Sequence, residues 1–165
     1  MPKGECLPPS QVLQTVLEVT RETEGFYAAA AQKSKADDVR AAFDSLKASG
    51  HEGADLLAQA FATMKCGEDK VLEPSPEDEM FLSALLESSF YRSSGRPTEI
   101  ALGLGSVEEF LEAAIRLERD LLLFYTKFWG VSCASHRPLF SGLIQRRQQH
   151  ITRLNELQKQ LKPRR

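Results

Sequence analysis

Apolar residues recur at intervals of three and four through most of this 165-residue chain, and we find no convincing run with the alternation typical of a strand. Clusters of glycine and proline interrupt the pattern and divide it into four long helical segments. The expected ranges are 10–34, 37–64, 106–129 and a fourth that begins between 135 and 138 and ends near 161. The sequence therefore predicts an all-α fold.

The connections between these segments differ in length. Two are short, whereas residues 67–105 separate the second long helix from the third. Ser75 and Pro76 offer a cap and a first-turn proline to an apolar run from Met80 to Phe90, which predicts a short extra helix. This organisation is that of a four-helix bundle with a long crossover between helices two and three. We expect the apolar crossover to pack along the bundle, and a dimer surface or docking patch is the alternative.

Length and charge fit one domain over residues 1–165. With 42% hydrophobic residues the chain can bury about 70% of its unfolded surface. A formal charge of −2 leaves no basic field for nucleic acid or an anionic membrane, and no apolar run of about 18 residues is present. Residues 1–9 lack the apolar core of a secretory signal and predict a flexible N-terminus, and residues 162–165 predict a solvated basic tail. We therefore expect a cytoplasmic protein that binds neither nucleic acid nor membrane.

Three cysteines, Cys6, Cys66 and Cys133, are scattered along the chain without a C-x-x-C pair. This spacing offers no zinc, iron–sulfur or redox-disulfide motif, so reduced thiols are expected.

The two halves of the sequence resemble each other. Phe26-Tyr27 matches Phe124-Tyr125 at an offset of 98, and Phe43 matches Phe140 at an offset of 97. Leu46 and Leu57 match Leu143 and Leu154 at the same offset of 97. The repeat predicts an internal duplication, with both tyrosines in the core and their hydroxyls satisfied.

Four segments carry a resemblance to a known family: Glu22–Ala31, Phe43–Leu46, Ala114–Tyr125 and Leu143–Leu157. Together they resemble the rubrerythrin branch of the ferritin-like superfamily over nearly the whole chain. The resemblance implies a ferritin-like four-helix bundle that forms a homodimer. In that family each half supplies a glutamate six residues before the Phe-Tyr pair and a Glu-x-x-His on its second helix, and these six side chains hold two irons.

Most of these metal-ligand positions are altered in this chain. The first-half positions fall on Thr20, Gly50 and Gly53, and the second-half positions fall on Glu118, Arg147 and His150. Only Glu118 and His150 keep a usable ligand type, and an arginine would repel a divalent ion. The chain also lacks the C-x-x-C pairs of the rubredoxin domain that many rubrerythrins carry. The resemblance therefore implies a divergent member with a degenerate diiron site.

Two interpretations of the remaining residues stay open. Glu118 and His150, with Glu24 as a possible replacement ligand, could form a residual half-site for iron or manganese. The favoured alternative is that Glu118 pairs with Arg147 inside the bundle, with His150 as a hydrogen-bonded neighbour and Glu24 as a solvated or paired charge. In that case we expect no cofactor.

The glycines at 50 and 53 are unusual because a glycine inside a helix costs about 1 kcal/mol relative to alanine. They could make room for the Arg147 side chain or an aromatic residue, leave a pocket for a small molecule or haem with His150 as axial ligand, or reflect drift after the site lost its use.

The function expected from these residues is a rubrerythrin-like protein that has lost its two-metal site and acts as a non-catalytic helical binding or structural module. The alternative is a divergent non-haem iron oxidoreductase, or peroxide-reducing protein, with a remodelled metal site. The sequence favours the module over the enzyme, and it names no partner beyond the implied homodimer.

Overall fold

A computed structural model of the protein describes residues 5–6, 9–63, 70–71, 76–77, 80 and 96–162. Its regular elements are helical except for β1 (Glu5–Cys6) and β2 (Lys70–Val71), two-residue strands that pair in parallel. The all-α prediction is therefore confirmed. No helix in the described ranges has the length and hydropathy needed to cross a membrane.

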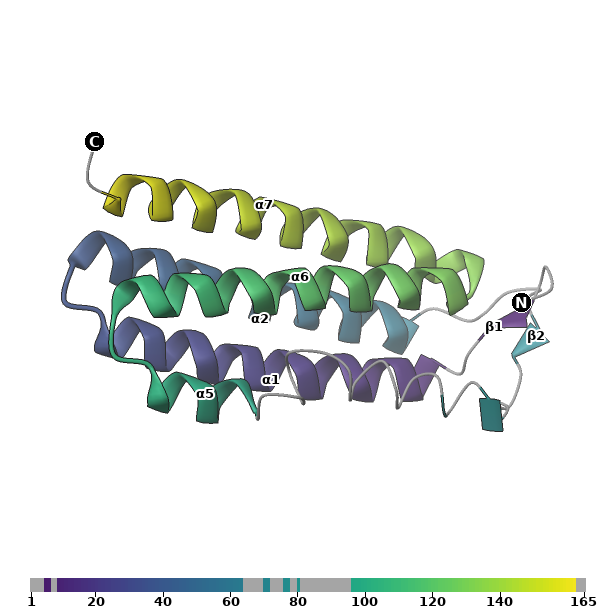
Figure 1. Ribbon diagram of the computed structural model, residues 1–165. Coiled ribbons are helices and arrows are strands. Elements are labelled where there is room, and N and C mark those ends of the chain that lie inside the picture. Colours follow the sequence, from purple (N-terminus) through teal and green to yellow (C-terminus); the bar gives the residue numbers. More distant parts are fainter. Residues whose placement is uncertain are drawn as a thin grey trace.

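Four long helices lie side by side and form a helical bundle (Figure 1). They are α1 (Pro9–Lys33), α2 (Asp37–Thr63), α6 (Val107–Val131) and α7 (Arg137–Leu161), and each agrees closely with its predicted range. The helices pack mainly as two hairpins, α1 on α2 and α6 on α7. A short 3-10 turn, η1 (Ala134–His136), precedes α7.

Local sequence explains where α6 begins. The Ser106 side chain accepts a hydrogen bond from the Glu109 backbone N–H at 3.2 Å, and the Glu109 carboxylate accepts one from the Ser106 N–H at 3.1 Å. This capping box satisfies backbone donors that a helix start leaves unpaired. Hydrogen bonds from the Gly105 and Ser106 backbone hold the pKa of the Glu109 carboxyl below its usual value.

The crossover contains a helix that the sequence pattern did not predict, α5 (Pro97–Gly103), which packs on α1. The two helices approach so closely at Gly25 that a Cβ there would overlap the Thr98 side chain. Lys33 Nζ donates to the carbonyl oxygens of Ala101, Leu102 and Leu104 at 2.7–3.2 Å. Beyond Met80 itself, the helix predicted over Met80–Phe90 lies outside the described residues.

Aromatic packing repeats in the two hairpins. The rings of Phe26 and Tyr27 meet edge to face with centroids 5.5 Å apart, and those of Phe124 and Tyr125 do so at the same separation. Tyr27 lies tilted on Phe43 at 6.1 Å, and Tyr125 lies tilted on Phe140 at 6.4 Å. The repeat predicted from sequence is therefore matched by repeated geometry.

One sequence expectation is wrong. Cys133, buried just before η1, is disulfide-bonded rather than reduced. The side chains of the other two cysteines, Cys6 and Cys66, fall outside what the structure describes. Cysteine spacing alone could not reveal this bond, because pairing depends on the distance between residues far apart in the chain.

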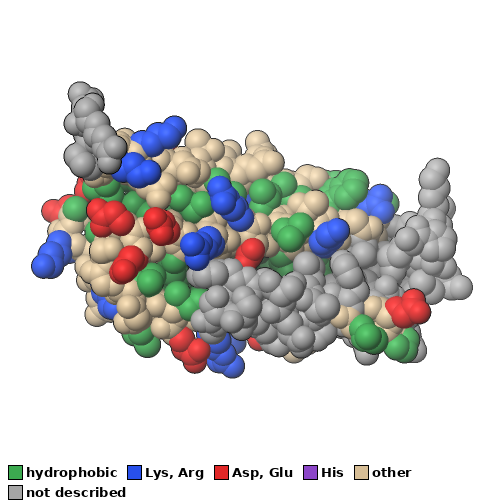
Figure 2. Space-filling view, in the orientation of Figure 1, with side chains coloured by type: hydrophobic (Ala, Val, Ile, Leu, Met, Phe, Trp, Pro, Cys, Tyr) green, Lys and Arg blue, Asp and Glu red, His purple; other side chains and the backbone are tan. Residues whose placement is uncertain are grey.

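On the face of the bundle shown in Figure 2, cationic and anionic side chains are interspersed over the described residues, with hydrophobic side chains between them. This mixed distribution agrees with the small net charge of −2.

Candidate functional site

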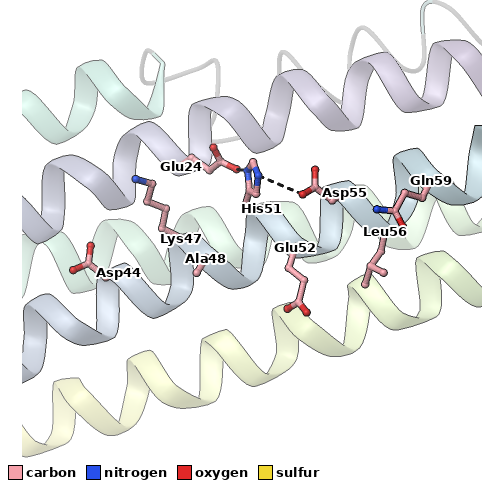
Figure 3. A pocket seen from close by; sticks show the side chains of 9 residues that line it. All are labelled: Glu24, Asp44, Lys47, Ala48, His51, Glu52, Asp55, Leu56 and Gln59. Carbon is pink, nitrogen blue, oxygen red and sulfur yellow. Dashed lines mark hydrogen bonds and ion pairs between the residues drawn. The ribbon is translucent and has the colours of Figure 1, made fainter.

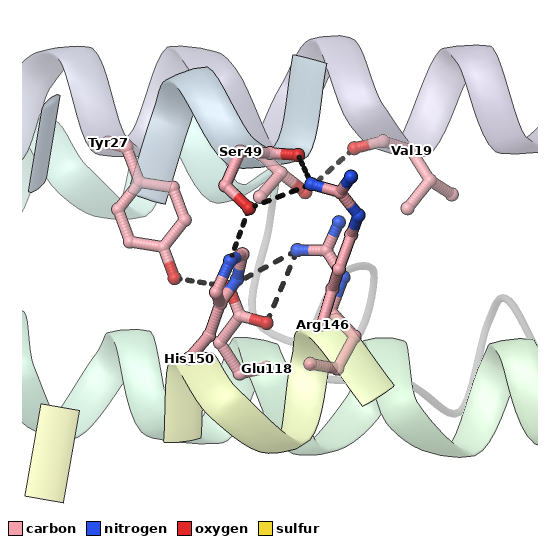
Figure 4. Close-up of polar contacts among 8 residues, drawn as sticks. Val19, Tyr27, Ser49, Glu118, Arg146 and His150 are labelled. Atoms are coloured by element: carbon pink, nitrogen blue, oxygen red, sulfur yellow. Dashed lines mark hydrogen bonds and ion pairs between the residues drawn. The ribbon is translucent and has the colours of Figure 1, made fainter. Parts of the chain in front are cut away.

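A carboxylate lies in the middle of the bundle with no exposure to solvent: Glu118, on α6. The Tyr27 hydroxyl, reaching across from α1, donates to Glu118 Oε1 at 2.5 Å (Figure 4). Arg147 Nη1, from α7, donates to Oε1 at 3.3 Å and to Oε2 at 3.2 Å. The buried ion pair favoured from the sequence is therefore present, and the hydroxyl of Tyr27 is satisfied as predicted.

His150 continues this cluster toward the surface. Its Nδ1 lies 3.2 Å from Glu118 Oε1, and its Nε2 lies 2.9 Å from Ser49 Oγ on α2. Because a carboxylate only accepts, Nδ1 is the donor to Glu118, and the partner of Nε2 is the Ser49 hydroxyl, which can donate or accept. Arg146 Nη1 in turn donates to Ser49 Oγ at 3.3 Å and to Glu52 Oε2 at 3.1 Å.

The neighbours of Glu118 decide its charge. Burial alone would raise the pKa of its carboxyl, but the Arg147 cation and the hydrogen bonds from His150 and Tyr27 outweigh burial and hold that pKa below its usual value. Burial opposes the charge on Arg147, yet the Glu118 carboxylate raises the pKa of that guanidinium. Burial and the Glu118 charge raise the pKa of the Tyr27 hydroxyl well above its usual value. The centre therefore holds one anion, one cation and a neutral tyrosine.

Gly50 on α2 faces the Arg147 side chain. A Cβ built on Gly50 would lie 3.7 Å from Arg147 Nη2, so the guanidinium occupies the side of α2 that this residue leaves bare. The guanidinium carbon also lies 5.5 Å from the ring centroid of Tyr125, within the range of a cation–π contact. An alanine methyl group at position 50 would make only an ordinary contact with Arg147, so a glycine is not needed there to make room for that side chain.

Gly53 has a different neighbour. Its Cβ would lie 3.0 Å from Leu143 Cδ2, so here α2 approaches the α7 side chains closely. The absent side chain permits helix packing, and neither glycine borders a haem-sized cavity among the pockets seen in the described residues.

The first half of the bundle has no counterpart of Glu118. Thr20 occupies the matching position and is buried, and its Oγ1 has no hydrogen-bond partner. Arg147 Nε is likewise buried without a partner. The polar centre is thus asymmetric, although the aromatic residues around it repeat.

Glu24 does not join the buried cluster. It lies in an outer groove between α1 and α2, where its Oε1 is 2.6 Å from His51 Nδ1 (Figure 3). Asp55 Oδ2 lies 3.4 Å from the other ring nitrogen of His51. The hydrogen bond and charge of Glu24 raise the pKa of the exposed His51. Glu24 is therefore a paired charge at the surface, and the structure brings only Glu118 and His150 of the three candidate ligands together.

These side chains do not fit the metal site that the resemblance implies. No group of three or more His, Cys, Asp or Glu side chains that could hold a metal ion occurs in the described part of the chain. The position beside Glu118 is filled by a guanidinium, which cannot deprotonate and offers no lone pair. Glu118 Oε1 already accepts hydrogen bonds from three side chains, so a metal ion would have to displace them.

Sequence reasoning missed Ser49, the partner of His150. The available signal was its place next to Gly50 on the inward side of α2, but a serine at a helix position usually bonds to its own backbone or to solvent. Arg146 was missed too. Two adjacent arginines, Arg146 and Arg147, give no sign in the sequence of which side chain points into the bundle.

Comparison with family models finds no match to this chain, and comparisons with curated proteins and with solved structures find none either.

Proposed function

We propose that this protein is a ferritin-like bundle, related to the rubrerythrins, that has lost the two-metal site and acts as a non-catalytic helical binding or structural module. The observation that carries the proposal is the contact between Arg147 Nη1 and both Glu118 oxygens, at 3.2 and 3.3 Å, in a position without solvent exposure. In this proposal the module works as a homodimer.

The charge balance supports the loss of metal. A buried carboxylate needs a compensating positive charge, which a bound metal or a cationic side chain can supply. Arg147 supplies it within the chain and remains charged at every physiological pH. A divalent ion at the same place would meet that cation at short range and would have to displace it.

A divergent non-haem iron enzyme remains the competing function, since Glu118 Oε1 and His150 Nδ1 are neighbours at 3.2 Å. Two protein ligands and an adjacent guanidinium make a weaker site than the carboxylate-rich sets that iron and manganese prefer. The two functions make opposite predictions for metal content.

Elemental analysis of the purified chain, expressed with added iron and manganese, separates them. We expect far less than one metal ion per chain in the native protein. Arg147→Glu places a carboxylate beside Glu118 and His150 and should increase metal content, whereas Arg146→Glu, the same charge change one residue away, should not. One or two tightly bound metal ions in the native chain would refute the proposal and support the enzyme.

A further inference from the structure

The disulfide of Cys133 leaves one cysteine of the chain over. Cys133 lies in the connection between α6 and α7, is 1% exposed and is disulfide-bonded. The sequence has two other cysteines, Cys6 and Cys66, so one of them holds the second sulfur of this bond and the other keeps a thiol. We call the cysteine that keeps the thiol the spare cysteine.

Chain connectivity keeps Cys6 and Cys66 at one end of the molecule. Cys6 belongs to β1, where it pairs with Val71 of β2. Cys66 precedes Lys70, the first residue of β2, by four residues, which can span at most about 14 Å. Both strands lie at the end of the bundle where α6 leads into α7 (Figure 1). The spare cysteine is therefore tethered near the Cys133 disulfide, which gives it a high effective concentration for attack on that bond.

The position of Cys133 favours its thiolate as a leaving group. The His136 N–H donates to the Cys133 carbonyl oxygen at 2.9 Å, so Cys133 begins the turn η1, which runs directly into α7. Backbone N–H groups at the start of a helix carry partial positive charge that stabilises an anion. The first four residues of α7, Arg137–Phe140, add a cation and no carboxylate. A thiolate in such surroundings leaves readily in thiol–disulfide exchange.

We propose that the Cys133 disulfide is redox-active and exchanges with thiols, first with the spare cysteine and then with a thiol reductant of the glutathione class. Because Cys133 is buried, the incoming thiolate attacks the sulfur bonded to it. A new S–S bond forms between these two sulfurs, the bond to Cys133 breaks, and its electron pair stays on Cys133 Sγ as a thiolate. This first step replaces one disulfide and one thiolate by another disulfide and thiolate, so nothing is oxidised or reduced overall.

The second step is a reduction. Two reductant thiols give two electrons and two protons to the new disulfide and leave as their own disulfide, so the chain ends with three thiols. The inference concerns the end of the bundle and does not depend on what the buried Glu118 centre does.

Thiol mapping on the full chain tests the first step. The protein is purified without reductant, incubated at about pH 8, and then unfolded in acidic urea that contains N-ethylmaleimide, which traps every free thiol. Peptide mass spectrometry gives the labelled fraction of each cysteine. We expect label on Cys133 as well as on the spare cysteine, because exchange moves the thiol between them. A native chain in which Cys133 is never labelled would overturn the proposal.

Reduction by glutathione separates a redox-active bond from a structural one. We expect glutathione to reduce the native chain while circular dichroism still shows its full helical content. Cys6→Ser and Cys66→Ser each leave Cys133 one partner and no spare cysteine, so each should be reduced at least tenfold more slowly than the native chain. A bond that is reduced only after the chain unfolds, or serine variants reduced as fast as the native chain, would overturn the proposal.

A pair of matched variants tests the role of Cys133 as the leaving group. Ser135 and Ser141 are both exposed, but Ser135 lies between Cys133 and α7, whereas Ser141 lies in the second turn of α7. Ser135→Asp places a carboxylate two residues from the departing thiolate and should slow reduction by glutathione severalfold. Ser141→Asp should leave the rate within twofold of the native value. Equal rates for the two variants would overturn the assignment of Cys133 as the leaving thiolate.

Discussion

Thr20 and Thr23 lie within one turn of α1, and both are buried, but their hydroxyls differ in their contacts. Thr23 Oγ1 donates to the Val19 carbonyl oxygen at 2.8 Å, whereas Thr20 Oγ1 has no partner. A buried hydroxyl without a hydrogen bond costs about 1–3 kcal/mol. Thr20 is also the position at which the family resemblance implies a metal-binding glutamate.

Thr20→Val should therefore increase the free energy of unfolding by about 1 kcal/mol, because it replaces the unpaired hydroxyl with a methyl group of similar size. Thr23→Val is the control and should lower it by a similar amount through loss of a made hydrogen bond. Urea denaturation followed by circular dichroism measures both. Equal effects of the two substitutions would contradict this account of the first-half position.

The buried cluster predicts how stability depends on pH. The folded-state pKa of Glu118 is lowered, so its contribution is present above the unfolded value of about 4.3 and is lost as pH falls through the folded value. The folded-state pKa of Tyr27 is raised, so its contribution is present below about 10 and is lost as pH rises through the folded value. The melting temperature should fall at both extremes.

Tyr27→Phe separates the two limbs of this profile. It removes the group that titrates at high pH and leaves the carboxylate, so the alkaline fall should become shallower while the acid fall remains. Melting temperatures from about pH 3 to pH 11 measure this. An unchanged alkaline limb in Tyr27→Phe would show that other groups control stability there.

Much of the buried site could be predicted from residue types. The family resemblance implied that Glu118, Arg147 and His150 lie together, and the charges of Glu118 and Arg147 then favoured an ion pair. The role of Ser49 could not be predicted, because the direction of its hydroxyl depends on the rotation of α2 against α7. The sequence makes Glu24 a candidate ligand because it lies one turn from Thr20, and only the rotation of α1 shows that it faces the outer groove with His51.

Alanine substitutions of the two glycines of α2 show whether close helix packing requires a glycine at either position. Gly50→Ala adds a methyl group at an ordinary 3.7 Å from Arg147 and should stabilise the protein by about 1 kcal/mol through helix propensity. Gly53→Ala adds one at 3.0 Å from Leu143, which is buried and cannot move freely, and should destabilise it by about 1–3 kcal/mol. Because both variants replace glycine by alanine in the same helix, a difference between their free energies of unfolding reports the difference in packing.

An equal gain from both substitutions would show that α2 and α7 separate easily at Gly53 and that both glycines reflect drift. A loss at Gly50 would instead show that Arg147 needs more space than the structure gives it.

The long helices were predictable because each carries a continuous apolar stripe and strong end signals such as the capping box at Ser106. The seven-residue helix α5 was not, since a helix this short is held by its surroundings. Its position depends on the close approach at Gly25 and on Lys33, which binds the carbonyl oxygens at its end. Neither contact is visible in the local sequence of the crossover.

The buried cluster joins the two helical hairpins. Tyr27 on α1 donates to Glu118 on α6, and Ser49 on α2 meets His150 on α7. The aromatic pairs that repeat between the hairpins surround this cluster. The aromatic packing is therefore repeated on both sides, while the charged groups at the centre come from the second half alone.

A double-mutant cycle on Glu118 and Arg147 measures how strongly the buried carboxylate depends on Arg147 as its counter-ion. Glu118→Gln and Arg147→Met should each lower the free energy of unfolding by about 3–5 kcal/mol, because each leaves one buried charge uncompensated. The double variant should lose no more than either single one, which gives a coupling of several kcal/mol. Additive losses, with a coupling below about 0.5 kcal/mol, would contradict the account.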